Sequence, residues 1–134
     1  MQGLHLTADL RRCAPAQRAM TDPDALRTLC LRAVREAGLL AVGELFHRFP
    51  QPAGASEPGG ITGVVLLAES HLAVHTWPEL GAVTLDVYVC NFGAENSGKA
   101  HALADALVAA FAPAAVDRHA LQRGSVAAPA GATA

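Results

Sequence analysis

The fold is decided by one continuous stretch, ITGVVLLAESHLAVHTWPELGAVTLDVYVC, which occupies residues 61–90. It contains three runs rich in β-branched and aromatic residues, at 61–67, 72–77 and 83–90. The polar Glu69-Ser70-His71 separates the first two runs, and the turn-forming segment 78–81 separates the last two. We therefore expect three consecutive antiparallel strands in the middle of the chain.

Further elements are predicted on both sides of this stretch. Residues 3–10 alternate between apolar and polar side chains, which is typical of a half-buried strand, and residues 39–49 predict another. Thr21-Asp22-Pro23-Asp24 is a helix start, and apolar residues at three- and four-residue steps predict a helix over 23–37 that ends at Gly38. A second helix, capped by Asn96 or Ser97, is expected to bury Leu103, Leu107, Ala110 and Phe111. A short strand over 116–121 follows.

This order of elements predicts an α+β fold, in which an antiparallel β-sheet carries two helices on one face as a two-layer sandwich. The other face of the sheet then needs water or a partner. We expect one domain over residues 1–123, while residues 124–134, rich in Ala, Gly, Pro and Ser, predict a flexible tail.

Composition narrows the class of protein. The chain has 134 residues, 51% of them hydrophobic, enough for one domain with a real core. A net charge of -2 without runs of like charge argues against nucleic acid as a partner. The apolar runs are too short to span a membrane, and the N-terminus lacks a signal-like pattern, so we expect a cytoplasmic protein. Three scattered cysteines indicate neither a disulfide framework nor a metal motif.

Polar side chains gather between residues 69 and 79, in an otherwise apolar region. Ser70 has two interpretations: an ordinary turn serine, or a hydroxyl that attacks a strained preceding peptide with help from a nearby acid or base. His71 and His75 lie on the same face of a strand, and with Glu69 or Glu79 they raise the possibility of a zinc site. A spacing of four residues on a strand separates them by roughly 13 Å, which argues against one shared ion.

Hairpin geometry brings Cys90 into this group. If the strands over 72–77 and 83–90 pair through the turn at 78–81, Leu72 lies opposite roughly Val87 to Val89. Cys90 then lies near Ser70, where a thiol can donate or accept a proton. The alternatives without a catalytic role are that Cys90 is a small buried hydrophobic residue and that Glu79 is a solvated acid in a turn.

The segment 61–79 resembles the bacterial and archaeal S-adenosylmethionine decarboxylase proenzymes, which are pyruvoyl-dependent. Weaker similarity lies in GLHLTAD at 3–9, in DVYVC at 86–90 and in Arg123-Gly124, so the resemblance covers nearly the whole chain. It implies self-cleavage between Glu69 and Ser70, which gives a β chain of residues 1–69 and an α chain of residues 70–134. Ser70 then becomes a pyruvoyl cofactor that forms a Schiff base with the amine of S-adenosylmethionine.

The resemblance also implies roles for other residues. His75 and Thr62 match positions that assist processing, and Cys90 matches the proton donor to the product carbon. Glu79 matches an acid that binds the ribose hydroxyls, and Phe49 matches an aromatic residue that stacks on adenine. Smaller members of the family are homodimers with sites near the interface. No metal is implied.

Two departures from the family pattern bear on the substrate. First, a longer Pro- and Gly-rich stretch separates Phe49 from Gly60 where the family has Phe-x-Pro-x-Gly. Second, Asn91-Phe92-Gly93 follows Cys90 where the family has a glycine directly after the cysteine. Phe92 is therefore a second candidate for the aromatic residue that stacks on adenine. Decarboxylation of S-adenosylmethionine, which supplies the aminopropyl donor for spermidine, is the favoured function. The alternatives are a pyruvoyl decarboxylase of arginine or ornithine and a non-enzymatic α+β binding module.

Overall fold

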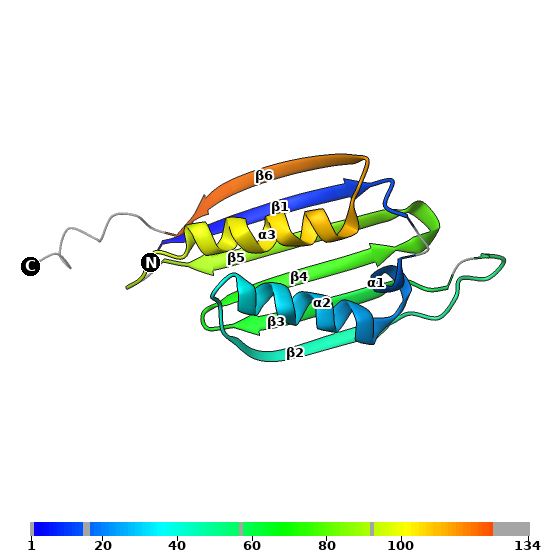
Figure 1. Ribbon diagram of the computed structural model, residues 1–134, viewed down its shortest axis with the longest axis horizontal. Helices are drawn as coiled ribbons and strands as arrows, with labels where there is room; N and C mark the ends of the chain where they lie inside the picture. Colours follow the sequence, from blue (N-terminus) through cyan, green and yellow to red (C-terminus); the bar gives the residue numbers. More distant parts are fainter. Residues whose placement is uncertain (1, 15–16, 57, 92, 125–134) are drawn as a thin grey trace, which may run out of the picture.

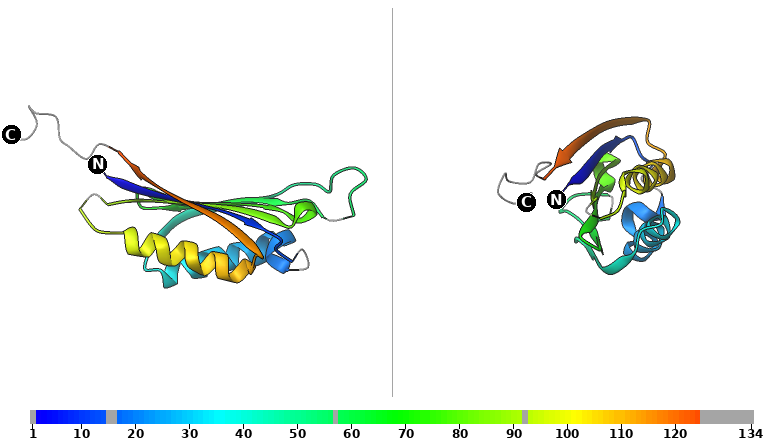
Figure 2. Two further views of the ribbon diagram at one scale, coloured as in Figure 1. Left: turned by 90° about the horizontal axis from the view of Figure 1, so that it is seen from above. Right: turned by 90° about the vertical axis from the view of Figure 1, so that its left-hand side faces the viewer.

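The structure is a six-stranded antiparallel sheet with its helices on one face, so the predicted α+β two-layer fold is confirmed (Figures 1 and 2). It is a computed structural model that describes residues 2–14, 17–56, 58–91 and 93–124. The elements in chain order are β1 (Gly3–Arg11), α1 (Arg18–Thr21), α2 (Pro23–Glu36), β2 (Ala41–Arg48), β3 (Ile61–Leu67), β4 (Ser70–Trp77), the 3-10 turn η1 (Pro78–Leu80), β5 (Ala82–Cys90), α3 (Ser97–Phe111) and β6 (Ala115–Arg123). The predicted tail falls almost wholly on residues 125–134, outside the described ranges.

The strands are arranged in the order β2-β3-β4-β5-β1-β6, and every neighbouring pair is antiparallel. The three central strands follow one another as the sequence predicted, and Leu72 lies opposite Val87. β1 is inserted between β5 and β6, so strands from the beginning and the end of the chain lie side by side (Figure 1).

Local chemistry sets the helix boundaries. The Asp22 carboxylate accepts a hydrogen bond from the Asp24 backbone N–H (3.0 Å), Pro23 occupies the first turn, and Gly38 has a positive φ of 84° just beyond the end of α2. Asn96, one of the two predicted residues, is the N-cap of α3, but its side chain makes no capping hydrogen bond. The Glu95 carboxylate accepts from the Ser97 backbone N–H instead (2.8 Å).

The core lies between the sheet and the two long helices. α2 buries Leu26, Cys30, Ala33 and Val34, and α3 buries Ala100, Leu103, Ala104, Leu107, Val108 and Phe111. The prediction that Ala110 is buried was wrong, because helical geometry turns it about 90° from the centre of that stripe. The prediction of two helices also missed α1, whose four residues are too few to show a helical period.

Thr76 is the one buried polar side chain that the described core contains, with 3% of its surface exposed. Its hydroxyl donates a hydrogen bond to the Met20 carbonyl (2.8 Å) and accepts one from the Ile61 backbone N–H (2.9 Å). Thr76 therefore ties the end of β4 both to the start of β3 and to the short helix α1.

The face of the sheet opposite the helices has no layer of secondary structure over it among the described residues (Figure 2). Alternation along β4 places His71, Ala73, His75 and Trp77 on this open face. Large apolar side chains from other strands lie exposed on it as well, namely Leu45, Leu66 and Leu121. The open face therefore combines a polar region with apolar surface.

Candidate active site

Ser70 begins β4 directly after a tight turn. Leu67 pairs with Ser70 across the β3–β4 hairpin, so only Ala68 and Glu69 form the connection. Glu69 has a φ of 54°, in the left-handed region that a residue with a side chain adopts at a cost of roughly 1–2 kcal/mol. The peptide bond between Glu69 and Ser70 therefore follows a strained residue.

Cys90 lies beside Ser70, as the hairpin geometry predicted. The Cys90 backbone N–H donates a hydrogen bond to Ser70 Oγ (3.1 Å), and the Cys90 side chain is buried, with the residue 7% exposed. A wide groove on the open face ends here and is lined by Glu69, Ser70, His71, Tyr88 and Arg123 among others. We call Ser70, Cys90 and this groove the serine end of the site.

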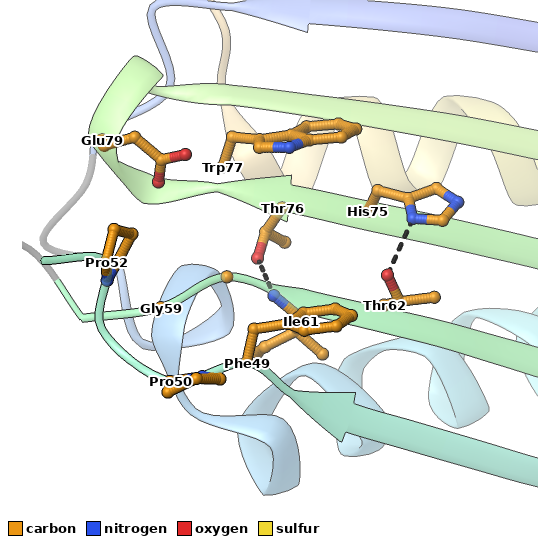
Figure 3. Close-up of a pocket in the computed structure, with 11 residues that line it drawn as sticks. Phe49, Pro50, Pro52, Gly59, Ile61, Thr62, His75, Thr76, Trp77 and Glu79 are labelled. Atoms are coloured by element: carbon orange, nitrogen blue, oxygen red, sulfur yellow. Dashed lines mark hydrogen bonds between the residues drawn. The ribbon is translucent and has the colours of Figure 1, made fainter.

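The other predicted site residues lie at the opposite end of β4. Thr62 Oγ1 and His75 Nδ1 are hydrogen bonded (2.9 Å), and the imidazole of His75 stacks on Trp77 with ring centroids 5.7 Å apart. Both rings border a pocket of about 170 Å³ that Phe49 and Glu79 also line (Figure 3). We call these residues and their pocket the histidine end of the site.

A single chain does not bring the two ends together. Ser70 and His75 are five residues apart on one strand, which corresponds to roughly 16 Å along β4. Proton transfer requires a hydrogen-bond distance of about 3 Å, or one bridging water. His75 therefore does not reach Ser70 of its own chain while β4 remains intact.

A polar cluster beside the serine end was not foreseen from the sequence. His5 Nε2 and Asp86 Oδ1 lie 2.9 Å apart, His71 stacks on Tyr88 (5.7 Å), and the Arg123 guanidinium lies over the Tyr88 ring (5.6 Å). Burial lowers the pKa of His71, with smaller lowering effects from His5 and Arg123, while Asp86 opposes them. The sequence did carry a signal for part of this cluster. His5 in β1 and Asp86 and Tyr88 in β5 alternate with apolar residues, which places the three side chains on one face once the strands pair.

The described residues contain no metal-binding cluster, and Cys30 is a buried structural thiol. No group of three or more His, Cys, Asp or Glu side chains there is arranged to hold a metal ion. All three cysteines are free, and burial raises the pKa of Cys30 to about 12, which makes its thiol unreactive. No described helix has the length and apolar character that crossing a bilayer requires.

Comparison with known proteins identifies the family. The profile of the S-adenosylmethionine decarboxylase family matches residues 4–124, and the chain belongs to this family. It is 37% identical to the S-adenosylmethionine decarboxylase proenzyme of Aquifex aeolicus strain VF5, over 92% of this chain and 82% of that protein. It is 35% identical to the proenzyme of Picrophilus torridus, over 92% of this chain and 85% of that protein.

A solved structure supports the same assignment. The crystal structure of the adenosylmethionine decarboxylase from Aquifex aeolicus VF5 superimposes with a TM-score of 0.80 at 33% sequence identity, covering 96% of this chain and 95% of that one. Of the two aromatic candidates for the substrate site, Phe49 lines the pocket at the histidine end, and Phe92 lies outside the described residues.

Proposed function

We propose that the chain is a proenzyme that cleaves itself between Glu69 and Ser70 and then decarboxylates S-adenosylmethionine in the cytoplasm, supplying the aminopropyl donor for spermidine. The observation that carries this proposal is the placement of Ser70, directly after the strained Glu69 and with Oγ held by the Cys90 N–H. The family membership supports the reaction, and the three free cysteines are consistent with a reducing compartment.

The chain's own groups can carry out the cleavage. Ser70 Oγ attacks the Glu69 carbonyl carbon, the C–N bond breaks as the C–O bond forms, and the released amine takes the hydroxyl proton. Loss of the Ser70 α-proton then expels the Glu69 carboxylate, and hydrolysis with release of ammonia leaves a ketone at position 70. Relief of the strain at Glu69 favours the first step.

The residues around position 70 fit a pyruvoyl group, because Ser70 begins its strand and borders an open groove that a substrate can enter. When present, this group provides a carbonyl that condenses with the substrate amine and accepts the electrons released as carbon dioxide departs. Cys90, beside position 70, is then placed to deliver a proton to the carbon that lost the carboxylate.

The pocket at the histidine end suits the nucleoside portion of the substrate. Phe49 and Trp77 offer aromatic surface for a purine ring, and the Glu79 carboxylate can accept two hydrogen bonds from ribose hydroxyls. Arginine and ornithine carry neither group. The relatives described above are named for S-adenosylmethionine, so neither the amino-acid alternative nor the binding module gains support from them.

The separation of the two ends supports a homodimer with shared sites. Two copies that pack open face to open face, with a two-fold axis near Ala73, place the serine end of one against the histidine end of the other. His75 and Thr62 of one copy then assist the cleavage at Ser70 of its partner. The apolar side chains exposed on the open face, and the small side chain at Ala73, favour such packing.

Mass measurement and a decarboxylation assay test the proposal. Denaturing mass spectrometry of the purified protein is expected to show two fragments divided before Ser70, with the fragment that starts at position 70 blocked by a pyruvoyl terminus, and Ser70→Ala is expected to remain one chain. Carbon dioxide release is expected from S-adenosylmethionine and not from arginine or ornithine. Cys90→Ala is expected to cleave normally and turn over slowly. An uncleaved wild-type chain would refute the proposal.

A further inference from the structure

A ten-residue arm, residues 50–59, leaves the sheet between β2 and β3 at the histidine end. The Phe49 backbone N–H donates to the Gly60 carbonyl (2.9 Å) and closes its base. A Cβ added at Gly59 would lie 1.9 Å from the Phe49 carbonyl oxygen, and one at Gly60 would lie 2.0 Å from the Thr76 carbonyl oxygen. Backbone passes so closely here that only glycine fits, so the base of the arm has a fixed position.

Residues 50–56 of the arm rise on the open-face side of the sheet, away from the helices (Figure 2). Its near part has hydrogen bonds of its own, since the Ala55 backbone N–H donates to the Pro52 carbonyl (3.1 Å) and the Gln51 side-chain amide donates to the Ala55 carbonyl. These bonds form a turn that positions Pro52. The beginning of the arm is therefore structured although it lies mostly exposed.

Pro50 and Pro52 line the pocket that Phe49, Trp77 and Glu79 also border (Figure 3). An engineered cavity of about 150 Å³ binds benzene, so the 170 Å³ here suits one planar ring system and not a whole nucleoside with its amino-acid chain. Two proline rings next to aromatic surface form an apolar wall, and the nearby Glu79 supplies an acceptor for hydroxyl groups. This combination suits a purine ring held in the pocket, with its ribose beside the Glu79 carboxylate.

We propose that Pro50 and Pro52 form a selectivity wall around the purine ring of the substrate, built by the long arm of this chain. The inference rests on the proposed function and goes beyond it, because it assigns substrate selection to the segment in which this chain departs from the shorter family pattern. A nucleoside packs its planar ring against the wall. A free basic amino acid has no planar ring system to place there.

The chain contains a built-in probe for this pocket. Trp77 is the only tryptophan in the sequence and lines the pocket, so its fluorescence reports ligands that enter. Adenosine is titrated into the full-length protein while Trp77 emission is followed. Adenosine carries the ring and ribose but no amine to react, so the measurement depends on binding and not on cleavage or turnover.

Three variants isolate the wall. Deletion of residues 51–58 joins Phe49-Pro50 to Gly59-Gly60, a two-residue connection with Pro and Gly at the positions a type II turn favours, so the hairpin can still close. Pro52→Ser removes one ring of the wall and keeps the arm. Ala53→Ser changes an exposed residue of the arm that does not line the pocket and serves as the matched control.

The wall predicts a graded result. The Kd of adenosine is expected to rise about tenfold in the deletion variant and about threefold in Pro52→Ser, because less apolar surface then covers the bound ring, and to stay unchanged in Ala53→Ser. The KM for S-adenosylmethionine is expected to rise in parallel while kcat and self-cleavage change little. Sedimentation reports whether the deletion alters assembly.

Other outcomes separate the inference from the function. If the variants bind adenosine as tightly as the wild type, the wall is refuted. If in addition their sedimentation changes, the arm contacts a second copy instead. If adenosine does not bind the wild-type protein, the wall is refuted as well. If adenosine binding depends on the arm but S-adenosylmethionine is not decarboxylated, the proposed function fails and the wall stands.

Discussion

Complementation between two inactive chains tests the shared site directly. In Ser70→Ala the cleavage nucleophile is absent, and in His75→Ala the group expected to move a proton is absent. The roughly 16 Å between these residues along β4 keeps them apart within one chain, so under the proposed shared site each site combines Ser70 from one copy with His75 from the other. In a mixed dimer, one site then carries both substitutions and the other carries neither.

The expected extent of cleavage follows from assembly statistics. His75→Ala alone is expected to cleave about 10²- to 10⁴-fold more slowly than the wild type, the usual loss for a general acid or base. When the two variants are co-expressed in equal amounts and assemble at random, about half of the His75→Ala chains lie in mixed dimers and become cleaved. The Ser70→Ala chains stay intact. Different affinity tags allow denaturing mass spectrometry to quantify each chain.

A double variant provides the matched control. A partner that carries both Ser70→Ala and His75→Ala assembles through the same surface but supplies no imidazole, so His75→Ala chains mixed with it are expected to remain uncleaved. If tagged mixed dimers are recovered and His75→Ala is still uncleaved beside Ser70→Ala, the shared site is wrong. Rapid cleavage of His75→Ala on its own would remove His75 from processing altogether.

Three further predictions concern stability and strain, and unfolding is measured in urea on the uncleaved Ser70→Ala background. Thr76→Val leaves two buried backbone groups, the Ile61 N–H and the Met20 carbonyl, without partners, and it is expected to lower the free energy of unfolding by about 2–4 kcal/mol. The control is Thr84→Val, at a half-buried position with no side-chain hydrogen bond among the described residues, and it is expected to change the free energy of unfolding little. Because the pKa of His71 is lowered in the folded protein, stability is expected to fall as the pH drops below about 6.5, and His71→Gln should reduce that slope; an unchanged slope would contradict the assignment. Glu69→Gly removes the cost of the positive φ and is expected to raise the free energy of unfolding by about 1 kcal/mol. With Ser70 intact, the same change is expected to slow self-cleavage about fivefold, and an unchanged rate would show that backbone strain at Glu69 does not contribute to cleavage.

Strand periodicity and turn positions were sufficient to predict most of the fold. The central hairpins and the proximity of Cys90 to Ser70 follow from counting residues on either side of the 78–81 turn, since an antiparallel register is fixed once its turn is known. Alternation on β4 likewise predicted that His71 and His75 share a face. These are local rules, and the chain obeys them.

Features that depend on distant parts of the chain could not be predicted in this way. The four residues of α1 hold their place partly because the Met20 carbonyl accepts from Thr76, 56 positions away. The pairing of His5 with Asp86 requires the register of β1 against β5, which no turn specifies. The distance between Ser70 and His75 could have been read from their spacing of five residues on one strand. The roles of both residues were inferred from resemblance to a family, and a resemblance does not say which copy of the chain supplies each residue.

The strand order has a consequence for the proposed cleavage. Division after Glu69 leaves β1, β2 and β3 in one fragment and β4, β5 and β6 in the other, yet the sheet order β2-β3-β4-β5-β1-β6 alternates between them. The fragments share three strand boundaries, at β3–β4, β5–β1 and β1–β6, so they are interleaved and not merely adjacent. The proposed cleavage would therefore turn the folding of one chain into an association of two fragments. Their apparent stability would depend on protein concentration, and they would separate only when the sheet unfolds.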